Sequence, residues 1–228
     1  MKVKLLVVTV LTSLVVLGSI STEGASPSVS GPTGMVNMPE AEVVGGGNIS
    51  LAGHILLADN TEVSLKANYG LTEDLEGGLR LDLGGDETSV TVYGKYKFLE
   101  KTATSPFSVA IGGGYSFAEI SVLNLYGVGS YYLDGTPLVL SGSIYWERIS
   151  REVAGEEVSD SDVALALGAN YMVNPKLDVV GELWFAGADR LNGGIRYYMS
   201  DKVSLEAFLI SAPILEDIHI VIGGSTYL

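Results

Sequence analysis

Side chains that could catalyse a reaction at neutral pH are scarce in this sequence. His54 and His219 are the only two histidines, and the chain has no cysteine. The sequence has nothing that resembles the serine- or aspartate-based catalytic groups of hydrolases. Two imidazoles without a third ligand also make a weak metal site. We therefore expect no catalytic residue, no metal site and no cofactor.

Two runs of three glycines, at 45–47 and 112–114, are the other motif that could carry chemistry. A phosphate-binding loop needs a following Lys-Ser/Thr pair and a helix, and neither run has them. Glycine within a strand pattern marks a bend or the close approach of another chain segment. We interpret both runs in that structural way.

The remaining chemistry lies in the charged residues, which are mostly acidic. The formal net charge is −14, and removal of Lys2 and Lys4 with a signal peptide leaves 11 basic against 27 acidic residues, or −16. Nucleic acid is therefore not an expected partner, because its binding requires cations that neutralise phosphates. The carboxylates alternate with Lys and Arg, which favours a charged interior over acid–base pairs.

The N-terminus has the pattern of a secretory signal peptide. Lys2 and Lys4 precede an apolar run over residues 5–16 and then a small-residue site. That run is too short to anchor the chain permanently. We expect a signal peptide over residues 1–21, with cleavage after Ser21 or as late as Ala25. An extended segment over residues 22–46 follows.

From residue 47 to the end, the sequence predicts an all-β protein. Segments of about ten residues alternate in polarity and are separated by turn residues, which is typical of a transmembrane barrel. We expect a transmembrane antiparallel up-and-down β-barrel of about twelve strands, within a range of ten to fourteen, with both termini periplasmic. The predicted strands are 47–58, 61–70, 75–84, 88–98, 107–117, 121–133, 137–147, 162–172, 176–187, 190–199, 202–212 and 217–228.

Alternation also predicts which side chains face inward. Along residues 62–69, Val63 and Leu65 take one face while Glu62 and Lys66 take the other. Charge on the lipid face is costly, so the polar face should line the lumen. The expected lumen-lining set is Glu62, Lys66, Glu76, Arg80, Asp82, Lys95, Lys97, Asp178, Glu182, Arg196, Glu206, His54 and His219. The aromatic residues expected to face inward are Tyr93, Tyr126, Tyr145, Trp184 and Tyr198, as filling of a narrow barrel or as a glycan track.

The two histidines allow two interpretations. A closed barrel pairs its first strand with its last, so His54 and His219 would both point inward near the closing seam. They are either unrelated polar residues of the lumen, which we favour, or neighbours that share a metal or titrate together.

Aromatic residues mark both predicted rims of the barrel. Tyr69, Tyr96, Tyr171 and Tyr197 end even-numbered segments, while residues such as Tyr115 lie near the opposite ends. Aromatic rings prefer the membrane–water boundary. The connection 150–161, with Glu152, Glu156, Glu157 and Asp160, is expected to be a solvated acidic outer loop.

Residues 31–42, Gly-Pro-Thr-Gly-Met-Val-Asn-Met-Pro-Glu-Ala-Glu, resemble the PTG-x-x-x-x-P-x-A signature that opens YjbH-like outer-membrane proteins. That group is linked to exopolysaccharide export. Turns such as residues 70–75 and 198–202 resemble those of outer-membrane barrels generally. The C-terminus departs from the usual assembly signal, since Leu228 is terminal and Tyr227 only penultimate.

The sequence therefore predicts an outer-membrane barrel that is a small passive pore for small solutes or ions. Conductance should be small at this strand number, cations should be preferred, and no plug is expected unless residues 26–46 fold inward. The alternative is a non-conducting structural or assembly barrel linked to exopolysaccharide export. The expected partners are outer-membrane lipid, the barrel-assembly machinery, and small solutes or polysaccharide.

Overall fold

A computed structural model describes residues 26–58, 60–84, 88–153, 156–185, 189–211 and 218–228. The predicted signal peptide lies outside the described residues. The strands are β1 (Ile49–Leu57), β2 (Glu62–Thr72), β3 (Leu75–Gly84), β4 (Ser89–Leu99), β5 (Phe107–Phe117), β6 (Ile120–Tyr132), β7 (Leu138–Val153), β8 (Glu156–Asn174), β9 (Leu177–Phe185), β10 (Arg190–Ser200), β11 (Val203–Ser211) and β12 (Ile218–Tyr227).

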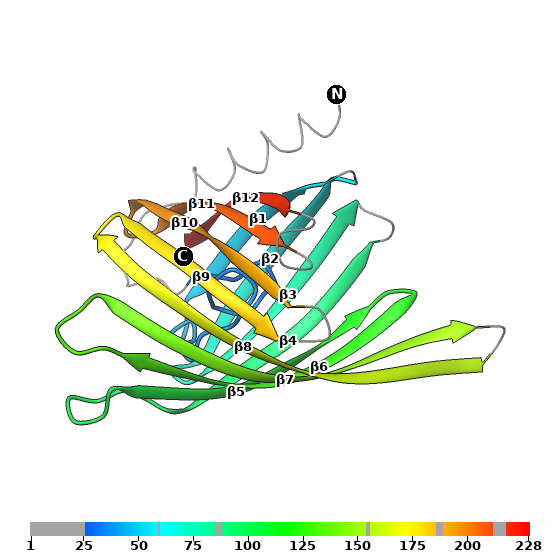
Figure 1. The fold of residues 1–228 in the computed structure, drawn as a ribbon, viewed down its shortest axis with the longest axis horizontal. Coiled ribbons are helices and arrows are strands. Elements are labelled where there is room, and N and C mark those ends of the chain that lie inside the picture. The colour runs from blue at the N-terminus through cyan, green and yellow to red at the C-terminus, as the bar shows by residue number, and fades with distance from the viewer. Residues whose placement is uncertain (1–25, 59, 85–87, 154–155, 186–188, 212–217) are drawn as a thin grey trace.

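The twelve strands form one closed antiparallel barrel in which each strand pairs with its neighbours in sequence (Figure 1). β1 closes the ring by pairing with β12, and this seam places Ile55 opposite Ile222. The predicted all-β, up-and-down barrel is confirmed. Among the described residues, no helix has the length and apolar character needed to cross a membrane.

The outer surface of the barrel is apolar and its inner surface is polar. Leu79, Ile144 and Leu167 face outward and are 53%, 54% and 56% exposed. Lys95 and Glu182 are buried, whereas their neighbours Tyr96 and Leu183, which point to the other face of the same strands, are exposed. This pattern is the reverse of a soluble protein and suits a barrel that contacts lipid.

Aromatic side chains surround the end of the barrel where Ser26 and the C-terminal Leu228 lie. Tyr69, Tyr96, Tyr171 and Tyr197 are all outward and between 44% and 47% exposed. Tyr115 lies toward the opposite end, where it packs edge-on against Phe117 at 4.7 Å between ring centroids. Such girdles are expected at both membrane–water boundaries.

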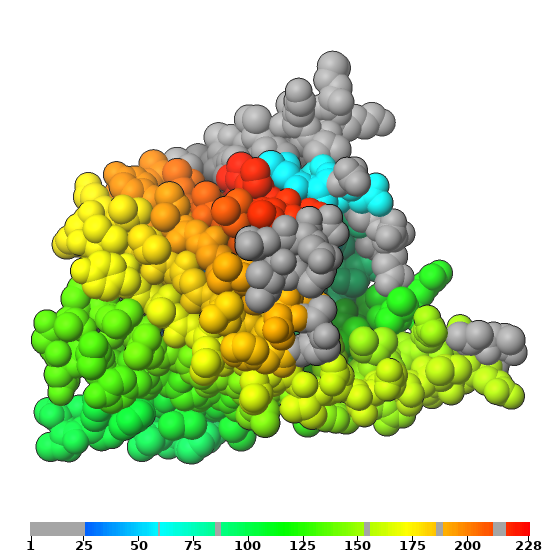
Figure 2. All heavy atoms as spheres, viewed as in Figure 1, coloured from blue at the N-terminus to red at the C-terminus, as the bar shows by residue number. Residues whose placement is uncertain are grey.

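The predicted acidic loop at 150–161 is wrong. β7 continues to Val153 and β8 starts at Glu156, so most of this stretch is paired strand, with Ser150 opposite Ser159. Beyond the membrane both faces of a hairpin can be polar, so the loss of alternation did not mark the strand ends. The hairpin extends as a ridge beyond the body of the barrel (Figure 2).

Large inward rings are accommodated by glycines directly opposite them. Gly112 faces Tyr126 and Gly78 faces Tyr93 in the strand registers. A Cβ atom on either glycine would overlap the facing ring. The glycine run at 112–114 therefore provides space for a facing side chain, as interpreted from the sequence.

Candidate functional site: the barrel lumen

The lumen is occupied by residues 26–46, which we call the lumen segment (Figure 1). It forms tight bends, with isolated bridges between Pro27 and Thr33 and between Gly34 and Pro39. The hydroxyl oxygen of Ser26 lies 3.3 Å from the hydroxyl oxygen of Ser225, and the main-chain N–H of Gly47 donates to the Gly70 carbonyl at 2.8 Å. Both ends of the segment thus lie at the rim where the C-terminal Leu228 is found. The sequence left open whether residues 26–46 fold inward. In the structure they fold into the lumen.

Apolar side chains of the lumen segment pack into the interior of the barrel. Met35, Val36 and Met38 are 0% exposed. Val36 packs in a cluster with Val180 and Phe208. None of the segment is visible on the face shown in Figure 2. Burial of each such side chain is worth about 1.5–3 kcal/mol, which favours this position.

Glu182 of β9 binds the deepest turn of the lumen segment through its main chain. The main-chain N–H of Asn37 donates to both carboxylate oxygens at 2.9 and 3.0 Å, and that of Met38 donates at 2.9 Å. Trp184 Nε1 and Asn192 Nδ2 also donate to Oε1, at 2.9 and 2.8 Å. The carboxylate therefore joins the segment to β9 and β10.

Glu76 of β3 binds the segment at two further points. It accepts hydrogen bonds from the main-chain N–H of Thr33 at 3.0 Å and from that of Val44 at 2.9 Å. The Thr33 hydroxyl donates at 2.6 Å to Oε2, the same oxygen that accepts from Val44. Lys95, directly opposite on β4, lies 3.3 Å from this carboxylate.

Cations of the wall bind carbonyl groups of the segment. Lys95 Nζ donates to the carbonyls of Thr33 at 2.8 Å and Glu40 at 3.1 Å. Arg196 donates to the Gly34 carbonyl at 3.2 Å, and Arg80 donates to the Ser30 carbonyl at 3.0 Å. The wall thus recognises the segment largely through its peptide groups.

Glu42 fixes the segment where it returns to the rim. Its carboxylate accepts hydrogen bonds from Ser108 at 3.0 Å and from Tyr132, and it pairs with Lys97 at 3.2 Å. Burial alone would raise the pKa of this carboxyl. The Tyr132 hydrogen bond and the Lys97 charge outweigh that effect, so the pKa of Glu42 lies below its ordinary value.

A second charged cluster lies at the closing seam. His54 Nε2 lies 2.6 Å from a Glu206 oxygen, and its Nδ1 lies 2.6 Å from Lys66 Nζ. Arg196 donates to Glu206 at 2.7 Å. These side chains are all buried, and their interactions tie β1 and β2 to β10 and β11.

The two histidines are not neighbours. His54 is paired with Gly223, which is four residues from His219 on β12. Four residues of strand span about 13 Å. Ile218 and Ile220 are exposed on the outer surface, so His219 between them takes the inward side. The hypothesis that the imidazoles share a metal or titrate together is therefore wrong, because they lie at different heights.

The other expected lumen residues occupy separate places. Arg80 pairs with Asp82 at 2.8 Å on β3, and Asp178 accepts from the Tyr198 hydroxyl at 2.9 Å. Glu62 is half-buried near the far end of β2. Within the described part of the chain, no group of three or more His, Cys, Asp or Glu side chains could hold a metal ion.

Three of the inward aromatic residues form a stack beside the segment. Tyr145 lies between Tyr126 and Trp184, with ring centroids 5.5 and 4.7 Å apart. Met35 and Met38 pack over this stack near Ala166. A Cβ atom on Gly168 would overlap Met35, so the wall leaves room for these methionines.

Comparison with known proteins identifies the fold. No family model and no curated protein matches this sequence. Among solved structures, the KdgM porin has a TM-score of 0.63 at 11% identity, covering 78% of this chain and 98% of its own. An outer-membrane channel from Pseudomonas putida F1 has a TM-score of 0.64 at 12% identity, covering 85% and 100%. The chain therefore has the fold of outer-membrane β-barrel channels.

Proposed function

We propose that this protein is a passive outer-membrane channel for small solutes or ions, closed at rest by the lumen segment. The observation that carries this proposal is a chain segment held inside a closed barrel mainly through its peptide groups. Twelve strands give a width between the filled eight-stranded barrels and the water-filled porins of about sixteen strands. The space left by that width is what the segment fills.

The similar structures support a transport function and suggest a class of solute. Both are described as a porin or a channel, and the KdgM porin is also known in complex with disordered oligogalacturonate. Short oligosaccharides are therefore candidate solutes here besides inorganic ions. No catalytic step is part of the proposal.

Export and orientation complete the proposal. The signal peptide over residues 1–21 directs export, the barrel-assembly machinery inserts the chain, and both termini stay on the periplasmic side. The lumen segment then inserts from the periplasmic rim. Its residues 31–42 carry the likeness to YjbH-like proteins, and a link to exopolysaccharide export belongs to the alternative, a non-conducting structural or assembly barrel.

Single-channel recording of the full chain in planar bilayers tests the proposal. We expect a small conductance with long closures, and more frequent openings in Gly168→Leu, because the new side chain displaces Met35 and Met38. Gly129→Leu is the matched control, since a Cβ atom there meets only the Ser108 carbonyl oxygen at 4.0 Å. Heat-modifiable migration on a gel shows first that each variant is folded.

A reversible lock distinguishes closure by the segment from other causes. The chain has no cysteine, so Met35→Cys with Gly168→Cys introduces the only pair. Oxidation should abolish openings, and reduction should restore them. Silence of the folded protein, of Gly168→Leu and of the reduced pair would reject the channel and support a non-conducting structural barrel.

A further inference from the structure

The wall of the lumen contacts the lumen segment mainly at main-chain groups. Glu182 accepts hydrogen bonds from two consecutive main-chain N–H groups, those of Asn37 and Met38. The hydroxyl of Ser130 accepts another from the main-chain N–H of Ala41 at 3.1 Å. Every residue except proline carries such an N–H group. These contacts would therefore also form with a peptide of another sequence.

An ion pair of the wall contacts both main-chain groups of a single residue. Glu76 and Lys95 are directly opposite each other on β3 and β4. Glu76 accepts from the N–H of Thr33 at 3.0 Å, and Lys95 donates to the carbonyl of Thr33 at 2.8 Å. A residue in a neighbouring antiparallel strand makes the same pair of contacts. The ion pair thus imitates a strand partner for the segment.

Donors and acceptors of the wall are separated in the way that a peptide requires. A carboxylate only accepts hydrogen bonds, and an ammonium or guanidinium group only donates them. Glu76 and Glu182 meet N–H groups, whereas Lys95 and Arg196 meet carbonyl groups. A sugar hydroxyl both donates and accepts, so binding an oligosaccharide does not require this separation. The pattern favours a peptide over an oligosaccharide as the ligand of the wall.

The wall also provides space for apolar side chains of the bound segment. Met35 and Met38 pack near Ala166, at a place where Gly168 leaves room for Met35. Val36 packs in a cluster that includes Phe208. Polar main-chain contacts beside apolar contacts of this kind would select peptides with apolar side chains.

We infer that the solute of this channel is a short peptide with apolar side chains, and that the lumen segment is a built-in mimic of that solute. This inference rests on the proposed function, because a second peptide can enter the lumen only when the segment leaves it. The apparent affinity of a free peptide is then lowered by the small fraction of protein that is open.

Binding of a fluorescent peptide to the folded full chain, measured by fluorescence anisotropy, tests the inference. The peptide has the sequence of residues 30–44 and is capped at both ends, so that it carries no terminal charge. Val36→Ser in the protein weakens the attached segment and leaves the wall unchanged. We expect this variant to bind the peptide about tenfold more tightly than the native chain does.

N-methylation of the peptide tests recognition of its main chain. Methyl groups on the nitrogens of Asn37 and Met38 remove the donors to Glu182 and should weaken binding at least about tenfold. N-methylation at Val43 is the matched control, since the N–H of Val43 forms no hydrogen bond with another described residue. Replacement of Asn37 by alanine in the peptide keeps the N–H group and should keep the affinity.

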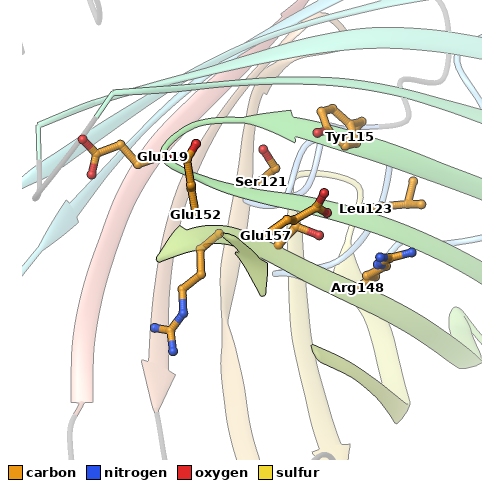
Figure 3. A pocket seen from close by; sticks show the side chains of 9 residues that line it. Tyr115, Glu119, Ser121, Leu123, Arg148, Glu152 and Glu157 are labelled. Atoms are coloured by element: carbon orange, nitrogen blue, oxygen red, sulfur yellow. The ribbon is translucent and has the colours of Figure 1, made fainter. Parts of the chain in front are cut away.

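Two protein variants locate the bound peptide. A separate hollow of about 490 Å³ is lined by residues of β5, β6, β7 and β8, among them Arg148 and Glu157 (Figure 3). A peptide that bound in this hollow would respond to Glu157→Gln, so we expect that variant to leave the affinity unchanged. In the Met35→Cys and Gly168→Cys pair, oxidation should abolish peptide binding and reduction should restore it.

Current recordings of Val36→Ser in planar bilayers separate this inference from the proposed function. Openings without any peptide binding would overturn the peptide assignment and leave the channel in place. Peptide binding without openings would support the peptide site and reject conduction. Equal binding of the two kinds of N-methylated peptide, or binding that persists in the oxidised cysteine pair, would overturn main-chain recognition in the lumen.

Discussion

Replacement of Glu182 by glutamine should open the channel at neutral pH. Glutamine keeps the size of the side chain but turns one carboxylate oxygen into an amide group that cannot accept a hydrogen bond. If that group takes the place of Oε2, the main-chain N–H of Met38 loses its acceptor, and Asn37 keeps only Oε1. An unsatisfied buried donor costs about 1–3 kcal/mol. This cost corresponds to an increase of about 5-fold to 150-fold in the ratio of open to closed protein.

Single-channel open probability at pH 7 measures this ratio directly. Asp178→Asn is the matched control, since Asp178 lies on the same strand, is also buried and accepts a hydrogen bond from Tyr198. It removes the same charge from the lumen, but the hydrogen bond it weakens comes from Tyr198 of the wall and not from the main chain of the segment. An open probability of Glu182→Gln equal to that of the control, in protein that keeps heat-modifiable migration, would refute the assigned role of Glu182.

Other predictions concern pH, selectivity and stability. Because the pKa of Glu42 lies below the usual 4.5, its ionised form stabilises the closed segment above about pH 4.5, and this contribution is lost as the pH falls through the lowered pKa. Channel openings should therefore increase below that pH, and Glu42→Gln should reduce this pH dependence of opening. If Glu42→Gln opens with the same pH dependence as the native chain, Glu42 is not an anchor of the segment. Reversal potentials in a salt gradient should show cation preference, because acidic residues outnumber basic ones at 27 to 13, and anion preference would contradict it. Gly112→Val should lower the free energy of unfolding by about 1–3 kcal/mol through overlap with Tyr126, measured by urea unfolding, and an unchanged midpoint would mean that the ring can move aside.

The barrel was predictable because its signals are local. Each strand alternates in polarity, and Tyr69, Tyr96 and Tyr171 mark one rim because each lies near the end of an even-numbered strand. Strand ends beyond the membrane were less predictable. Around Ser150 and Ser159 both faces contact water, so polarity no longer distinguishes a paired strand from a loop.

The contents of the lumen were not predictable from local pattern. Asn37 and Glu182 are 145 positions apart, and their contact involves a main-chain N–H that every residue except proline carries. Glu76 and Lys95 could be assigned inward by alternation, but no sequence signal shows that they bind Thr33. Similarly, the separation of His54 from His219 depends on the seam register, which alternation does not specify.

The proposed opening is physically reasonable because each charged group that holds the segment also has a partner in the wall. Without the segment, Glu182 keeps its hydrogen bonds from Trp184 and Asn192. Glu76 keeps Lys95, and Arg196 keeps Glu206. Water that replaces the segment can satisfy the remaining donors and acceptors, so no charge is left buried and unpaired. The main cost of opening is then exposure of apolar side chains such as Val36, which favours closure at rest without making it irreversible.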